Sequence, residues 1–261
     1  MSNGVSIIDF YNMETDFATE FRRLLHNIRN LQGDADLKSI MVTSAMLAEG
    51  KSTVAAFLAL TAAKKGMKSL LLDADLRRPT AHRLFGMDRD NGLAEVLSGE
   101  TTVKSVIRKT SLEKFDIITA GRAVPNPSEL FDSRAIGNVI TEMKFYYDLI
   151  VIDSPPVIPV SDPMLLAQEV DGVLLVVKAG ATQREVVSRA TDILRSQSRK
   201  LLGVVLNNMT NQLPYYYDYS HYGYDYAPRP KDLARSKSKR SRRDQGEAVE
   251  DQPPADKSSR Q

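Results

Sequence analysis

The sequence predicts an α/β fold in which helices cover both faces of a mostly parallel β-sheet. Short, continuous apolar runs alternate with longer stretches of helical periodicity along most of the chain. Strands of a parallel sheet are buried on both faces, so they appear as continuous apolar runs separated by helices. The composition agrees with this class, because 42% hydrophobic and 26% charged residues are typical of a globular protein.

The predicted elements follow from periodicity. Residues 14–31 carry apolar side chains at helical spacing and predict an amphipathic helix. Apolar runs predict strands at 39–43, 68–72, 115–119, 148–152, 172–177 and 203–206. Further helices are predicted at 50–65, 133–144, 163–168 and 184–196. Asn126 followed by Pro127 predicts a helix start after a surface loop.

We divide the chain into four regions. Residues 1–32 form an N-terminal segment with an oligomerisation or docking helix, and 33–212 form the main α/β domain. Residues 213–227 form a tyrosine cluster, and 228–261 a tail that is first basic and then acidic. Between Arg229 and Arg243 the tail has eight Lys or Arg residues and one acid. Few large apolar residues are available to offset the ordering entropy, so this tail is predicted to be disordered.

Composition excludes several classes of protein. The chain has no cysteine and three scattered histidines, which excludes thiolate metal sites and disfavours histidine ones. No apolar run approaches the roughly eighteen residues that a membrane-spanning helix needs. The first residues lack the basic and apolar regions of a secretory signal. We therefore expect a cytoplasmic protein.

The strongest motif, from Thr43 to Thr53, lies between an apolar strand and a helix. Its Gly50-Lys51-Ser52 core is typical of a Walker A phosphate-binding loop. The backbone amides of such a loop face phosphates at a helix N-terminus, where the helix dipole favours anions. Lys51 would reach the β- and γ-phosphates of ATP, and the Ser52 hydroxyl would ligate Mg²⁺. Ala45 replaces the usual first glycine, and a chance Gly-Lys-Ser at a helix start is the alternative.

Acidic residues follow two further apolar strands. Asp73 and Asp75 are spaced so that both side chains point to one side of an extended chain. One could hold Mg²⁺ through water while the other accepts a proton from an attacking hydroxyl. An Asp-rich turn paired with Arg77 and Arg78 is the alternative. Asp153 closes another apolar strand in a Walker B arrangement and would also contact Mg²⁺.

Seven of the ten tyrosines gather near the end of the chain. They are Tyr215, Tyr216, Tyr217, Tyr219, Tyr222, Tyr224 and Tyr226. Interleaved polar residues leave no apolar face, so an aromatic interaction segment or a stacking segment is one interpretation. Beside a phosphate-binding loop and paired carboxylates, the cluster indicates phosphoacceptors.

Together these features resemble the bacterial tyrosine kinases (BY-kinases), which use a P-loop NTPase-type fold. The resemblance extends from about Thr19 to Tyr226. Its supporting stretches are Phe21-Arg22, Asn27-Ile28, the Walker A loop, Asp73 to Pro79, Gly92-Leu93, Val96-Leu97, Gly99, Asn126 to Leu130, Asp153 to Pro156, Gly203 to Asn207 and the tyrosine cluster. It implies ATP-dependent autophosphorylation of the tyrosines.

The resemblance also implies roles for individual residues. The nucleotide would be held by Ala48, Glu49, Gly50, Lys51, Ser52 and Thr53, with Asn207 at the adenine. Mg²⁺ would be held by Ser52 and Asp153, with Asp75 assisting its shell. Asp73 would orient or deprotonate the incoming tyrosine, although the residues by themselves allow Asp73 and Asp75 to exchange roles.

The same resemblance implies partners. These are further copies of the chain for trans-phosphorylation, a separate transmembrane activator of the polysaccharide co-polymerase type, and a cognate tyrosine phosphatase. Phosphorylation would control exopolysaccharide or capsule polymerisation or export at the inner face of the cell membrane. The basic stretch 229–243 could bind anionic lipids, whereas nucleic acid is a less favoured partner and a solvated tail the plain alternative.

Two departures from the family pattern bear on function. Leu47-Ala48 replaces the usual Pro-Gly, and Ala48 fits without strain only if its φ is negative. Thr19, Arg22 and Leu25 stand where the oligomer helix carries Glu, Arg and Arg. The rival functions are a nucleotide switch of the partitioning-ATPase type and an ATP-binding pseudokinase scaffold. Ala45-Met46-Leu47 lacks the additional lysine of the partitioning class.

Overall fold

The computed structural model describes residues 6–31, 37–197 and 201–208. These residues all lie within one compact unit, Met1–Gln212. The tyrosine cluster at 213–227 and the predicted tail at 228–261 lie outside the described residues. In the part of the chain that is described, no helix is both long enough and apolar enough to span a bilayer.

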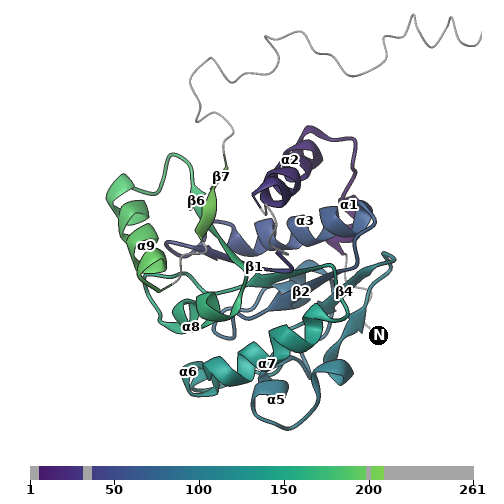
Figure 1. The fold of residues 1–261 in the computed structure, drawn as a ribbon. Coiled ribbons are helices and arrows are strands. Elements are labelled where there is room, and N and C mark those ends of the chain that lie inside the picture. The colour runs from purple at the N-terminus through teal and green to yellow at the C-terminus, as the bar shows by residue number, and fades with distance from the viewer. Residues whose placement is uncertain (1–5, 32–36, 198–200, 209–261) are drawn as a thin grey trace, which may run out of the picture. The chain divides into compact units, whose positions relative to one another are not determined.

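A mostly parallel sheet forms the centre of the described residues (Figure 1). Its strands are β1 (Ser39–Ser44), β2 (Ser69–Asp73), β3 (Arg108–Lys109), β4 (Phe115–Ile118), β5 (Leu149–Asp153), β6 (Gly172–Lys178) and β7 (Leu201–Asn207). Their order is β3-β4-β2-β5-β1-β6-β7, and only the edge pair β3–β4 is antiparallel. The predicted mostly parallel sheet is confirmed.

Helices cover both faces of this sheet, as predicted (Figure 1). They are α1 (Ile7–Phe10), α2 (Asp16–Asn30), α3 (Lys51–Lys64), α4 (Ala81–Leu84), α5 (Leu93–Leu97), α6 (Pro127–Leu130), α7 (Ser133–Lys144), α8 (Asp162–Glu169) and α9 (Arg184–Gln197), with a 3₁₀ turn at Val103–Val106. Alternate residues of each central strand enter different cores, because side chains alternate across a sheet. Met41 faces the α5, α7, α8 and α9 side, whereas Ile40 and Val42 face the α2, α3 and α4 side.

The amphipathic helix α2 begins at an N-cap, where the Thr15 side chain accepts a hydrogen bond from the Ala18 amide. Phe21, Leu25 and Ile28 are buried on its inner face and belong to the same core cluster as α3. The apolar face of the N-terminal helix is therefore part of the domain core. Phe17 is half exposed, at 48%, and contacts neighbouring aromatic rings at the edge of the core.

Several short elements were not predicted. The helices α1, α4, α5 and α6 have four or five residues, and β3 has two. Elements of this length do not complete enough turns or alternations to produce a periodic signal. One start was nevertheless predicted, because Asn126 and Pro127 begin α6 with proline in its first turn.

Candidate active site

The phosphate-binding loop connects β1 to α3 at the carboxyl edge of the sheet. No side chain caps the N-terminus of α3, so the amides of its first turn are available to an anion. Gly50 is the N-cap and has φ +91°, a left-handed conformation that favours glycine. A Cβ at Gly50 would lie 2.0 Å from the side-chain amide nitrogen of Asn207, so a larger residue here would also displace the Asn207 side chain.

Ala48 in the same loop has φ +60°. Alanine is free of strain at this position only if its φ is negative. The observed positive φ therefore means that the loop carries local backbone strain at Ala48. An L-residue in the left-handed region is disfavoured by about 1–2 kcal/mol. The loop thus keeps a conformation suited to glycine although the side chain at this position is a methyl group.

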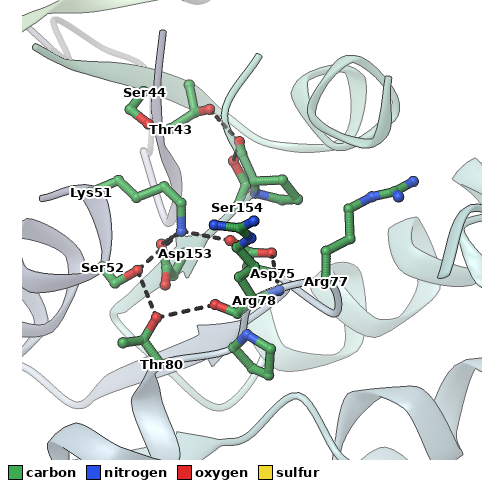
Figure 2. A network of polar contacts seen from close by, with 12 residues as sticks. Thr43, Ser44, Lys51, Ser52, Asp75, Arg77, Arg78, Thr80, Asp153 and Ser154 are labelled. Atoms are coloured by element: carbon green, nitrogen blue, oxygen red, sulfur yellow. Dashed lines mark hydrogen bonds and ion pairs between the residues drawn. The ribbon is translucent and has the colours of Figure 1, made fainter. Parts of the chain in front are cut away.

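Lys51 occupies the centre of a charged cluster (Figure 2). Its Nζ lies 2.8 Å from Asp75 Oδ2 and 3.2 Å from Asp153 Oδ1, and it donates to Ser52 Oγ at 3.0 Å. Burial lowers the pKa of Lys51, but the neighbouring Asp153 and Asp75 carboxylates outweigh this and raise it. The lysine is therefore charged throughout the neutral pH range.

Asp73 is fully buried and hydrogen-bonded to backbone. Its Oδ2 accepts from the amides of Thr80 (3.0 Å) and Ala81 (2.9 Å), and its Oδ1 accepts from the Asp75 amide (3.2 Å). These bonds hold the turn between β2 and α4. Burial and the nearby Asp153 charge raise the pKa of Asp73 to about 7, despite the amide donors.

Asp75, two residues after the end of β2, and Asp153, the last residue of β5, complete the cluster, since β2 and β5 pair in parallel. Asp75 Oδ1 accepts from the Arg78 amide at 2.9 Å, which leaves Oδ2 for Lys51. Asp153 Oδ2 is buried and has no hydrogen-bond partner. Burial raises the pKa of Asp153 above its usual value. The Lys51 charge and a hydrogen bond with Ser52 lower the pKa but do not cancel the effect of burial.

These donors fit Mg²⁺. The Ser52 hydroxyl and the carboxylates of Asp75 and Asp153 are hard oxygen ligands, and the free Asp153 Oδ2 is an acceptor that needs a partner. Among the described residues, no three His, Cys, Asp or Glu side chains gather as a metal site. Mg²⁺ in phosphoryl-transfer sites is usually held by one or two carboxylates together with substrate phosphates.

The arginines next to the acidic pair do not neutralise it. Arg77 Nε lies 2.7 Å from Asp162 Oδ2 on α8, and Arg78 contributes only its backbone amide to Asp75. The alternative of an Asp-rich turn paired with Arg77 and Arg78 is therefore wrong for these side chains. The cation that forms an ion pair with Asp75 is Lys51.

Glu49 connects the phosphate loop to two other segments. Its side chain is only 3% exposed; it accepts from the Met46 amide at 2.7 Å and from the Thr182 hydroxyl. The Glu49 carbonyl accepts from the side-chain amide of Asn207 at 2.9 Å. The connection between β6 and α9 and the end of β7 are thereby fixed to the loop. The sequence pointed to Glu49 and Asn207 but missed Thr182, because a threonine in a loop carries no motif.

Comparison with known proteins identifies the family. A family model described as NUBPL iron-transfer P-loop NTPase matches residues 37–218. Tyrosine-protein kinase YwqD of Bacillus subtilis is 36% identical over 204 residues, which cover 78% of this chain and 85% of YwqD. The putative tyrosine-protein kinase CapB of Staphylococcus aureus is 35% identical and covers 78% of this chain and 91% of CapB. The chain belongs to the bacterial tyrosine-protein kinases.

A solved structure supports the same assignment for this kinase. The chimerical protein CapA2B2 superposes with a TM-score of 0.72 at 35% identity, over 76% of this chain and 88% of that chain. The P-loop fold and the family that the sequence predicted are confirmed.

The fold brings together the predicted Lys51, Ser52, Asp75 and Asp153, and the adjoining Asp73 accepts a hydrogen bond from the Asp75 amide. Besides Thr182, a second residue of this kinase's site was not foreseen: Thr80 Oγ1 donates a hydrogen bond to Ser52 Oγ at 3.2 Å. The predicted phosphoacceptor tyrosines lie outside the described residues.

Proposed function

We propose that this kinase transfers the γ-phosphoryl group of ATP to tyrosines of the 215–226 cluster. The observation that carries the proposal is the ion pairing of Lys51 with Asp75 and Asp153, with Asp73 beside them, at the uncapped N-terminus of α3. In the transfer, the tyrosine oxygen forms a bond to the γ-phosphorus, and the bond to the β–γ bridging oxygen breaks to release ADP. The phenol proton passes to a carboxylate.

We assign the steps to individual residues. Lys51 and the amides of 48–53 hold the phosphates, and Ser52, Asp75 and Asp153 would hold Mg²⁺. When bound, Mg²⁺ neutralises charge that develops on the phosphate oxygens. Asp73 is the proposed base: three backbone amides use its oxygens, out of about four lone-pair sites. A pKa of about 7 is well matched to proton transfer near neutral pH. Asn207 is proposed to contact the adenine from the end of β7.

The wider assignments rest on the family resemblance. We propose that copies of the chain phosphorylate one another, that a separate transmembrane co-polymerase-type protein activates the kinase, and that a tyrosine phosphatase reverses the reaction. The process controlled would be exopolysaccharide or capsule polymerisation or export at the inner membrane face. On α2, the third position of the family's oligomer motif is Leu25, which is buried in the core. Any assembly surface on α2 therefore uses other positions, such as the exposed Glu20–Arg23 ion pair.

The proposal is tested by incubating the full chain with Mg-ATP and probing for phosphotyrosine, with and without the activator's cytoplasmic segment. Wild type should label, whereas Lys51→Met and a variant with all seven clustered tyrosines changed to Phe should not. Absence of phosphotyrosine in wild type under both conditions overturns the kinase assignment.

One observation favours a second candidate, an ATP-binding scaffold without transfer activity. Ala48 strains the phosphate loop at φ +60°, and such strain could impair the placement of the γ-phosphate. Nucleotide binding without phosphotyrosine, restored to phosphotyrosine formation by Ala48→Gly, would identify this state. ATP hydrolysis stimulated by lipid or DNA, with no phosphotyrosine, would instead indicate a partitioning-type switch.

A further inference from the structure

The turn between β2 and α4 contacts three residues of the proposed site. The Arg78 amide donates to Asp75 Oδ1 at 2.9 Å. The Thr80 amide donates to Asp73 Oδ2 at 3.0 Å. The third contact uses a side chain, because the Thr80 hydroxyl donates to Ser52 Oγ at 3.2 Å (Figure 2). A substitution at position 80 can remove this third contact selectively, since the other two are made by backbone amides.

Thr80 is the N-cap residue of α4, yet its hydroxyl does not cap that helix. Within the described residues, the Thr80 side chain accepts no hydrogen bond from the first turn of α4. Asp73 Oδ2 takes this place, because it accepts from the amides of both Thr80 and Ala81. The usual N-cap arrangement is seen on α2, where the Thr15 side chain accepts from the Ala18 amide at 3.2 Å. The Thr80 hydroxyl is therefore directed to another use.

The Ser52 hydroxyl oxygen has two acceptor lone pairs. It accepts from Lys51 Nζ at 3.0 Å and from the Thr80 hydroxyl at 3.2 Å. Lys51 is also the group assigned to the phosphates, so nucleotide draws its ammonium away and leaves one lone pair of Ser52 for a cation. The bond from Thr80 does not depend on nucleotide and restricts rotation of the Ser52 side chain. The Arg78 carbonyl, at 3.3 Å, is a second acceptor that keeps the Thr80 hydroxyl in the turn.

We propose that Thr80 is a positioning residue whose hydroxyl orients Ser52 Oγ toward Mg²⁺ in the nucleotide complex. The amide of the same residue holds Asp73, so one residue of the turn fixes both the proposed metal ligand and the proposed base. The inference rests on the proposed function, because it concerns the magnesium site of that reaction. It adds a residue that acts through Ser52 rather than on the nucleotide.

A purely structural hydroxyl would have different consequences. Thr80→Val removes the bond to Ser52 but keeps the amide bond to Asp73, and it costs no side-chain cap because Thr80 provides none to α4. A positioning role therefore predicts a loss confined to nucleotide binding that depends on Mg²⁺. A structural role predicts a lower stability and an equal loss of binding with and without Mg²⁺.

The test measures binding of a fluorescent ADP analogue to the full chain, at increasing MgCl₂ concentration and in EDTA. Thr80→Val should raise the MgCl₂ concentration for half-maximal tightening about fivefold, with the Kd in EDTA changed less than about twofold. Thr80→Ser keeps the hydroxyl and should bind like wild type. The matched control is Thr15→Val, the same replacement at the cap of α2. It should lower the urea midpoint and leave both binding values unchanged.

A double-mutant cycle tests whether Thr80 acts through Ser52. Ser52→Ala removes the oxygen that Thr80 orients, so adding Thr80→Val to this variant should change the MgCl₂ requirement by less than about twofold. A full fivefold effect in the Ser52→Ala background would overturn the route through Ser52. If the valine variant does not fold, Thr80→Ala takes its place in both comparisons.

The outcomes separate this inference from the kinase assignment. An unchanged MgCl₂ requirement in Thr80→Val, an equal weakening of binding in MgCl₂ and EDTA, or a Thr80→Ser variant as defective as Thr80→Val overturns the positioning role and leaves the kinase assignment intact. Wild-type binding that does not respond to Mg²⁺ overturns it as well. Binding that depends on Mg²⁺, without any phosphotyrosine in wild type, contradicts the kinase assignment, whereas a selective effect of Thr80→Val would still support the role of Thr80.

Discussion

The Lys51 ammonium lies 2.8 Å from the Asp75 carboxylate, and the two side chains are only 10% and 2% exposed. Asp153 is bonded to the same ammonium, and Asp73 lies next to this group, so one cation faces three buried carboxylates. Buried like charges are unfavourable unless further cations or protons balance them. This excess of negative charge is what a site that binds Mg²⁺ provides, and it makes the site sensitive to substitutions that change charge.

Replacement of Lys51 should abolish transfer more than it affects folding. In Lys51→Met, the phosphates lose their cation and tyrosine phosphorylation should fall by about 100-fold or more. The matched control is Lys65→Met, which removes an exposed lysine from the end of the same helix. Initial rates of phosphotyrosine formation check this prediction. Equal losses in both variants would contradict it.

Glycine at position 48 should relieve the strain of the phosphate loop. Because Ala48 has φ +60°, Ala48→Gly should raise the free energy of unfolding by about 1 kcal/mol and lower the KM for ATP. The control is Ala63→Gly inside α3, where glycine should cost about 1 kcal/mol. Urea unfolding measures both changes. Destabilisation by Ala48→Gly would show that the left-handed conformation is not strained.

Neutralising Asp153 should stabilise the nucleotide-free protein at neutral and higher pH. The pKa of Asp73 is about 7 in the folded state, above its usual 3.8, so the folded state binds more protons between these values. Stability from this group is therefore largest at low pH and is lost as pH rises toward 7. Asp153→Asn removes the neighbouring charge and lets the pKa of Asp73 fall.

The difference in unfolding free energy between Asp153→Asn and wild type should consequently grow from about pH 5 to about pH 8. Urea titrations at both pH values measure it, and the contribution of other groups, including His82, cancels in the comparison. Activity should be lost in the same variant, because its proposed Mg²⁺ ligand is gone. A difference that shrinks with rising pH would contradict the electrostatic account.

The links made by Glu49 should position the loop for nucleotide. Glu49→Ala removes the acceptor for both the Met46 amide and the Thr182 hydroxyl and should raise the KM for ATP about tenfold, with a smaller change in kcat. Glu49→Gln can still accept from Met46 and donate to Thr182, so it should retain a KM near wild type. Thr182→Val should have an intermediate effect. Steady-state kinetics of all three variants distinguish positioning from a loss of charge, because a charge effect would make Gln as harmful as Ala.

Much of the site could be predicted because it is encoded locally. Gly50, Lys51 and Ser52 follow an apolar strand and begin a helix, and Asp73 and Asp153 end apolar strands. The carboxyl ends of parallel strands meet at one edge of a sheet, so strand ends alone placed these residues near one another. The sequence also showed that alanine replaces the usual glycine at position 48. The φ of Ala48 could not be predicted, because it depends on the conformation of the whole loop.

The sequence by itself therefore determined the layered α/β fold, the phosphate loop and the acids around it, because periodicity and strand ends are short-range properties of the chain. Only the tertiary structure decided that Lys51 rather than Arg77 pairs with Asp75, and that Asp73 accepts backbone amides. It also decided that Thr182 and Asn207 attach to Glu49. These contacts join segments far apart in the chain, and no local pattern specifies which of several compatible polar groups meet when the strands assemble.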